Sequence, residues 1–128
     1  MKTLECIMLI DDDHLTNFYN KIILEKGNAA NEIVVFENGK TALEYLKDND
    51  NKVDLILLDI NMPLMNGWQF LEHYDKLDDK RKAKMIIMLT SSAHSDDKKM
   101  VEKHGSVKKF INKPLVPDTI KLILSLFE

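Results

Sequence analysis

Carboxylates stand directly after two apolar runs in this chain. Residues 5–10 are followed by Asp11, Asp12 and Asp13, and a later run is followed by Asp59. An apolar run that stops at an acid is typical of a buried parallel strand that delivers a polar side chain to one edge of a sheet. Two such strands side by side would bring together charges that repel by about 4 kcal/mol at a separation of about 4 Å. We therefore expect a cation, a shifted pKa, or both, at this edge.

Strand-like runs and helix-like segments alternate along the whole chain. The apolar runs are residues 5–10, 32–36, 54–58, 85–89 and 107–111. This alternation predicts one α/β domain over residues 1–128, with a doubly wound, flavodoxin-like parallel sheet. For five strands the common order is 2-1-3-4-5, and ligands bind at the carboxyl ends of the strands where that order reverses.

The segments between the runs carry helical periodicity and end signals. One apolar face of the first helix is expected to lie against the core. Its members are Leu15, Phe18, Tyr19, Ile22 and Ile23. Asp13 is predicted to cap this helix, and Gly27 to end it in a left-handed conformation. Asn66 and Gln69 have the spacing of a capping box for the third helix.

Composition limits the class of protein. The net charge of −3 argues against a nucleic-acid surface, and the basic run 80–82 is too short to change that. Cys6 is the only cysteine, so no internal disulfide can form and a reducing compartment is expected. No signal peptide and no membrane span is evident, which predicts a cytoplasmic location. The four histidines lack metal-ligand spacing and are predicted to be surface or capping residues.

Polar groups also follow two other strands. The fourth run leads into Thr90, Ser91 and Ser92, and the fifth into Lys113. The second run ends at Phe36 and, in the predicted order, lies outside this cluster. The polar strand ends therefore fall where the topology makes them converge.

The residue types at this edge suggest phosphoryl chemistry. Clustered carboxylates suit a hard divalent cation, most plausibly Mg²⁺ with several waters. An aspartate can act as a nucleophile and form an aspartyl phosphate. Lys113 can offer a point charge to a phosphoryl oxygen, and Thr90 a hydrogen bond to another.

At these residues the chain resembles a response-regulator receiver domain. The motifs that carry the likeness are Ile10-Asp11-Asp12, Leu58-Asp59-Ile60-Asn61-Met62-Pro63, Asn66-Gly67, Thr90-Ser91 and Lys113-Pro114. They occur in the family's order and extend over essentially the whole chain.

The resemblance implies a role for each matched position. Asp59 would be the phosphoacceptor. Asp12, Asp59 and the backbone carbonyl of Asn61 would ligate Mg²⁺, with Asp11 acting through water. Thr90 and Lys113 would contact the phosphoryl group. The Lys113–Pro114 peptide bond would be cis. Phe110 occupies the family's aromatic switch position, where many members have tyrosine, so a hydroxyl is missing there.

The expected function is that of a stand-alone phosphoacceptor switch in a two-component system or phosphorelay, without an effector domain. The donor would be a histidine kinase or a histidine phosphotransfer protein. The output would be a changed choice of partner, or a homodimer, through the fourth helix, fifth strand and fifth helix. Leu122 and Leu126 lie off the predicted core stripe of that last helix and add an apolar second face. The chain is not expected to be a turnover enzyme, or to bind nucleic acid or membranes.

Three other classes stay open on the residues alone. A flavodoxin-like cofactor binder would need a phosphate-cradling loop after the first strand, where acids stand instead. A phosphatase with an aspartate nucleophile would usually have a second acid two places on, where Asn61 stands. A receiver-like scaffold that works without phosphorylation would lack part of the site.

Overall fold

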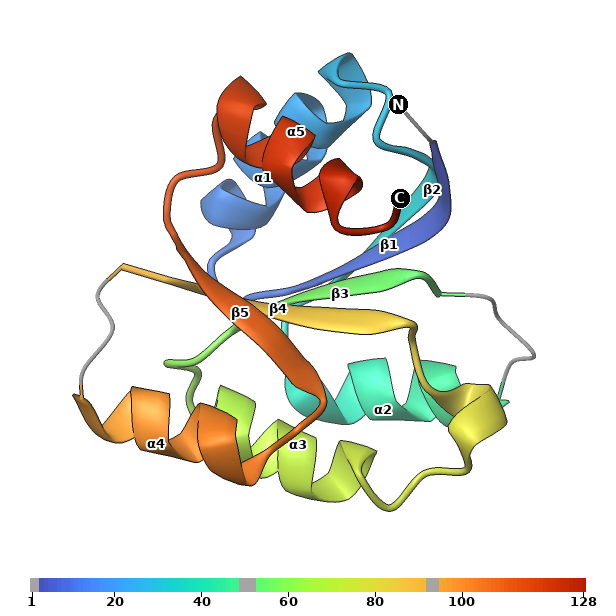
Figure 1. Cartoon of the computed structure of the whole chain (residues 1–128). Helices are drawn as coiled ribbons and strands as arrows, with labels where there is room; N and C mark the ends of the chain where they lie inside the picture. Colours follow the sequence, from blue (N-terminus) through green and yellow to red (C-terminus); the bar gives the residue numbers. More distant parts are fainter. Residues whose placement is uncertain (1–2, 49–52, 92–94) are drawn as a thin grey trace.

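The computed structural model describes residues 3–48, 53–91 and 95–128, so Ser92 and His94 lie outside the described residues. A five-stranded parallel sheet forms the middle layer (Figure 1). Its strands are β1 (Leu4–Ile10), β2 (Ala30–Phe36), β3 (Leu55–Asp59), β4 (Met85–Thr90) and β5 (Val107–Asn112). The order is β2-β1-β3-β4-β5, which confirms the predicted topology.

Helices cover both faces of the sheet. They are α1 (His14–Lys26), α2 (Gly39–Asp48), α3 (Gly67–Tyr74), α4 (Ser95–Lys103) and α5 (Pro117–Ser125), with a short 3₁₀ turn at Asp79–Arg81. Figure 1 shows α1 and α5 on one face, and α2, α3 and α4 on the other. Within the described part of the chain, no helix has the length and apolar character needed to cross a membrane.

Two hydrophobic clusters fill the space between the layers. Successive residues of β1 alternate between them: Met8 and Ile10 join the cluster under α2 and α3, whereas Ile7 and Leu9 join the one under α1 and α5. Because both faces are covered, all five residues of β3 are buried. The rigid sheet that results fixes where each strand ends.

Side-chain caps set several helix starts as the sequence predicts. Asp13 is the N-cap of α1 and accepts a hydrogen bond from the backbone N–H of Leu15. Asn66 and Gln69 form the predicted capping box at the start of α3. Pro117 occupies the first turn of α5.

The predicted core face of α1 is wrong for its first three residues, whereas Ile23 packs against the core as expected. Leu15, Phe18 and Tyr19 are 73%, 60% and 41% exposed, whereas the buried residues of the helix are Asn17, Asn20 and Leu24. One reason is the side-chain amide of Asn17, which donates a 2.7 Å hydrogen bond to the backbone carbonyl of Asp11. That bond and the burial of Leu24 turn the aromatic face of the helix outward.

The left-handed residue after α1 is also not the one predicted. Gly27 has φ −85°, which any residue adopts, and the positive φ of 50° falls on Asn28. Asparagine tolerates this region better than most side chains. The backbone N–H of Gly27 bonds to the carbonyl of Ile23, so Gly27 still closes the helix, in an ordinary conformation.

This geometry predicts that replacing Asn28 costs more stability than replacing Gly27. Gly27→Ala should be tolerated, because its new Cβ would lie at an ordinary 3.4 Å from the nearest side-chain atom. Asn28→Ala should lower the free energy of unfolding by about 1 kcal/mol. Urea denaturation of both variants checks this, with Asn28→Gly as the control that relieves the strain. A larger loss for Gly27→Ala than for Asn28→Ala would contradict the assignment.

Candidate functional site

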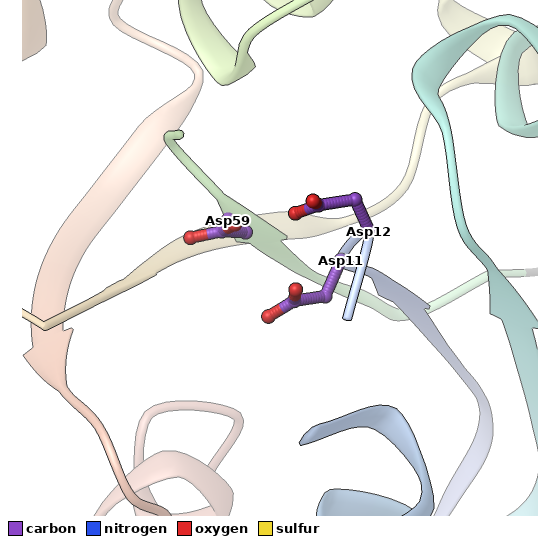
Figure 2. A group of neighbouring side chains, drawn as sticks. All are labelled: Asp11, Asp12 and Asp59. Atoms are coloured by element: carbon purple, nitrogen blue, oxygen red, sulfur yellow. The ribbon is translucent and has the colours of Figure 1, made fainter. Parts of the chain in front are cut away.

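Three carboxylates meet at the carboxyl edge of the sheet. Asp11 and Asp12 follow β1, Asp59 ends β3, and β1 and β3 are neighbours, with Ile10 opposite Leu58. One carboxylate oxygen from each aspartate lies within 4.8 Å of the other two. Figure 2 shows the three side chains gathered at the ends of these strands. Asp11 and Asp59 are only 4% and 6% exposed, whereas Asp12 is open to solvent.

Lys113 joins two of these carboxylates. Its ammonium Nζ lies 2.7 Å from Oδ2 of Asp11 and 3.1 Å from Oδ1 of Asp59. The backbone N–H of Lys113 donates to the carbonyl of Thr90 over 2.8 Å, which fixes the lysine just beyond the end of β5. The following Lys113–Pro114 peptide bond is cis.

The charge balance of the cluster is incomplete. Burial, and then the charge of Asp11, raise the pKa of Asp59 above its usual value, although Lys113 acts in the opposite sense. Burial alone would lower the pKa of Lys113, but its hydrogen bond to Asp11 and the nearby carboxylates outweigh this and raise it. Lys113 therefore stays protonated at neutral pH, while Asp59 still pays a net penalty for ionisation.

A hard divalent cation fits this donor set. The three carboxylates offer oxygen ligands, the type that Mg²⁺ and similar ions prefer, and Asp12 faces solvent where waters can complete the shell. One added cation would also offset the charge of Asp11, which after burial is the next cause of the raised pKa of Asp59.

Residues close to Asp11 in the sequence hold it in position. Its Oδ1 accepts a 2.9 Å hydrogen bond from the backbone N–H of Asp13, while its Oδ2 faces Lys113. Its carbonyl accepts from the Asn17 amide. Asn17 was not predicted to support the site. The available signal was a pair of asparagines three residues apart, Asn17 and Asn20, on one face of the helix.

The other residues predicted for the site differ in how far they are buried. Thr90 ends β4 and is buried. Asn61 lies two residues beyond Asp59 and is exposed, so its role through the backbone carbonyl stays a prediction. Phe110 lies on β5 and meets the ring of Trp68 edge-on, with ring centroids 6.2 Å apart.

One histidine does not fit the predicted surface role. His104 is buried, its Nδ1 lies 3.0 Å from a carboxylate oxygen of Asp75, and its ring stacks on Trp68. Its position just after α4, between two helices, could not be read from histidine spacing.

A doubly wound α/β domain with an acidic pocket and a bridging lysine at its switch point is the class that the fold and the site define. Residues 7–125 match the response regulator receiver domain, and the chain belongs to this family. It is thus a receiver domain of the kind found in two-component signalling.

Curated relatives place the same domain in different settings. The chain is 38% identical over 105 residues, 80% of its length, to a protein-glutamate methylesterase/protein-glutamine glutaminase of Desulfotalea psychrophila, of which it spans 27%. It is 30% identical over 119 residues, 93% of its length, to two-component response regulator 24 of Arabidopsis thaliana, of which it spans 78%. It spans only 5% of histidine protein kinase 1 of Candida albicans. Two of these relatives are therefore much longer than this chain, which covers 27% and 5% of their length.

Solved structures agree with the fold. A two-component response regulator from Cytophaga hutchinsonii has a TM-score of 0.88 and 27% identity, with 99% of this chain and 100% of that chain covered. A response regulator receiver protein from Dyadobacter fermentans gives 0.84 and 25%, with 96% and 98% covered.

The raised pKa of Asp59 has a consequence for stability. A carboxyl whose pKa rises on folding stabilises the fold below its usual value of 3.8, and this contribution is lost as the pH rises through the folded pKa. Asn carries no charge, so Asp59→Asn should raise the free energy of unfolding at pH 7 without Mg²⁺ by about 1 kcal/mol.

Denaturant titrations in a chelator at several pH values measure this difference. It should shrink as the pH falls toward 4, and also when Mg²⁺ is added. Asp13→Asn, a change of the same kind in the helix cap, should not be more stable than the parent at pH 7, because the hydrogen bond from the Thr16 side chain lowers the pKa of Asp13, and it should not respond to Mg²⁺. An Asp59→Asn variant that is no more stable than the parent at pH 7 would contradict the proposed charge imbalance.

Proposed function

We propose that this receiver domain is a phosphoacceptor switch that takes a phosphoryl group from a phosphohistidine onto Asp59. The observation that supports it most directly is the position of Asp59. Its buried carboxylate lies 3.1 Å from the Lys113 ammonium and beside two further acids. A nucleophile, a phosphoryl-binding cation and a metal-ligating pair are then within reach of one another.

In the proposed reaction, a carboxylate oxygen of Asp59 attacks the phosphorus of the donor phosphohistidine. The P–N bond breaks, and the imidazole nitrogen keeps the electron pair and is protonated from solvent. The product is an acyl phosphate on Asp59. Water later attacks the phosphorus, which returns the carboxylate and releases inorganic phosphate. The chain acts once per phosphoryl group and is not a turnover enzyme on outside substrates.

Asp12 and Asp59 would hold Mg²⁺, with the Asn61 carbonyl and, through water, Asp11. When bound, the ion supplies the positive charge that lets the Asp59 carboxylate approach an anionic phosphoryl group. Two residues of the chain would bind the phosphoryl oxygens. Lys113 can exchange its contact with Asp59 for one with a phosphoryl oxygen, and the Thr90 hydroxyl can donate to another.

Phosphorylation adds nearly two negative charges beside Lys113 and Thr90, and their rearrangement would bias the face made of α4, β5 and α5. Leu122 on α5 is exposed and suits a partner or a second copy of the chain. Leu126 packs against the core, so the apolar face of α5 is narrower than the sequence suggests. Phe110 cannot contribute a hydroxyl to this coupling.

The outward face of α1 suits the phosphodonor protein. Leu15, Phe18 and Tyr19 are exposed at helical spacing, and Leu15 and Tyr19 line a hollow of about 330 Å³ that Lys113 and Pro114 also border. The apolar surface therefore begins next to the phosphorylation site. A protein docked here would present its histidine to Asp59 while covering side chains that now face water.

Intact-mass analysis after incubation with acetyl phosphate and Mg²⁺ tests the acceptor. We expect one acid-stable, base-labile phosphoryl adduct, absent in Asp59→Asn and retained in Asp13→Asn, which changes a neighbouring acid outside the cluster. An adduct on Asp59→Asn would refute the assignment. Mg²⁺ binding without any adduct would favour a phosphorylation-independent scaffold, and sustained turnover of phosphate esters a phosphatase.

The role of α1 is tested by comparing two donors. Phe18→Ser should lower the rate of transfer from a phosphorylated histidine phosphotransfer protein about ten-fold, the effect of losing one apolar interface anchor. Labelling by acetyl phosphate should not change, since this small donor needs no docking surface. Leu122→Ser, an equivalent change on α5, is the matched control. Equal transfer rates in both variants would place the donor elsewhere.

A further inference from the structure

We propose that Trp68 transmits phosphorylation of Asp59 to α4, by holding α4 against α3 before phosphorylation and releasing it afterwards. This inference rests on the proposed phosphorylation of Asp59. It assigns to one side chain of α3 a link that the missing hydroxyl of Phe110 cannot supply.

The start of α3 is packed directly on the backbone of the acceptor. The N–H of Gly67 donates to the carbonyl of Ile60 over 2.8 Å. A Cβ at Gly67 would lie only 2.7 Å from the carbonyl oxygen of Asp59 and 3.0 Å from Cα of Ile60. Because no side chain separates them, a shift of the backbone at Asp59 displaces the first turn of α3, where Trp68 is the next residue.

The indole of Trp68 then contacts α4 and β5 at once. Its Nε1–H donates to Oδ1 of Asp97 in α4 over 3.1 Å. Its ring stacks on His104, just after α4, with centroids 6.0 Å apart and an interplanar angle of 20°. It also meets the ring of Phe110, at the proposed switch position, in a T-shaped arrangement. The residue is almost fully buried, so it cannot move without disturbing these neighbours.

A second contact completes the attachment at the other end of the two helices. Asp75, the C-cap of α3, accepts through one carboxylate oxygen from Nδ1 of His104 over 3.0 Å, and through the other from the Ser106 hydroxyl over 3.2 Å. We call the Trp68–Asp97 and Asp75–His104 contacts the α3–α4 clasp. Of the described residues of α4, Met100 and Val101 are the apolar ones that pack against the core, and both are only partly buried. The clasp is therefore a substantial part of what holds α4 in place.

One polar atom of the α3–α4 clasp lacks a hydrogen bond. With Nδ1–H of His104 donating to Asp75, the buried Nε2 has no hydrogen-bond partner among the described residues. A buried polar atom without a partner makes the closed arrangement less stable than a complete network would be. This suits a contact that has to open when the backbone at Asp59 moves.

Trp68 is the only tryptophan of the chain, so its emission reports on the clasp without labelling. We expect its emission to change when the wild-type chain is phosphorylated with acetyl phosphate and Mg²⁺, and to stay constant in Asp59→Asn. Intact mass of the same samples gives the extent of phosphorylation. If no adduct forms, the proposed function fails, and this inference with it. If the adduct forms and the emission is unchanged, only this inference is overturned.

Amide hydrogen exchange over α4 and β5 supplies a test independent of emission. Trp68→Phe removes the donor and Asp97→Ala the acceptor, so a shared effect reports on the bond between them. Both should exchange α4 amides about five-fold faster before phosphorylation. Both should also lose most of the acceleration that phosphorylation causes in the wild type.

Tyr74→Phe is the matched control, because it removes hydrogen bonds to Ala83 from the same helix without touching the clasp. It should leave both exchange rates of α4 as in the wild type. Full retention of the phosphorylation-dependent change in Trp68→Phe and Asp97→Ala would overturn the role of Trp68, provided that intact mass shows equal phosphorylation.

Discussion

The repulsion among carboxylates at the end of β1 and β3 is the constraint on which the other features of the site depend. Parallel neighbours end at the same edge, so Asp11 and Asp59 are brought together as a direct consequence of strand order. The Lys113 ammonium neutralises part of this negative charge, since its Nζ lies 2.7 Å from a carboxylate oxygen of Asp11 and 3.1 Å from one of Asp59. Burial, and then the charge of Asp11, still raise the pKa of Asp59, and the three acids together could hold a metal ion. In the proposed function, this excess of negative charge is what a cation would offset before Asp59 meets a phosphoryl group.

The parts of the structure that local rules determine were predictable from the sequence. Strand order followed from alternation and from apolar runs buried on both faces, and Asn66 and Gln69 met at the spacing their side chains require. The clustering of Asp11, Asp12 and Asp59 followed from strand ends alone. These features need no knowledge of how one side chain packs against another.

Features that depend on tertiary contacts were missed or wrong. The periodicity of α1 was real, but the bond from Asn17 to the Asp11 carbonyl decides which face turns inward. The left-handed conformation was predicted at Gly27 but occurs at Asn28, because Gly27 ends the helix with an ordinary negative φ. His104 is buried because it hydrogen-bonds to Asp75 and stacks on Trp68, both far away in the sequence, and no local pattern along the chain indicates these contacts.

The two faces of α1 are under different evolutionary constraints. Asn17, Asn20 and Leu24 face the protein and are constrained by packing, whereas the exposed side chains of Leu15 and Phe18 contribute little to the fold's stability. Substitutions on that outer face can therefore accumulate after a gene duplicates, without unfolding the product or altering the acidic pocket. Under the proposed docking of the phosphodonor on α1, changes confined to this outer face would exchange one upstream partner for another.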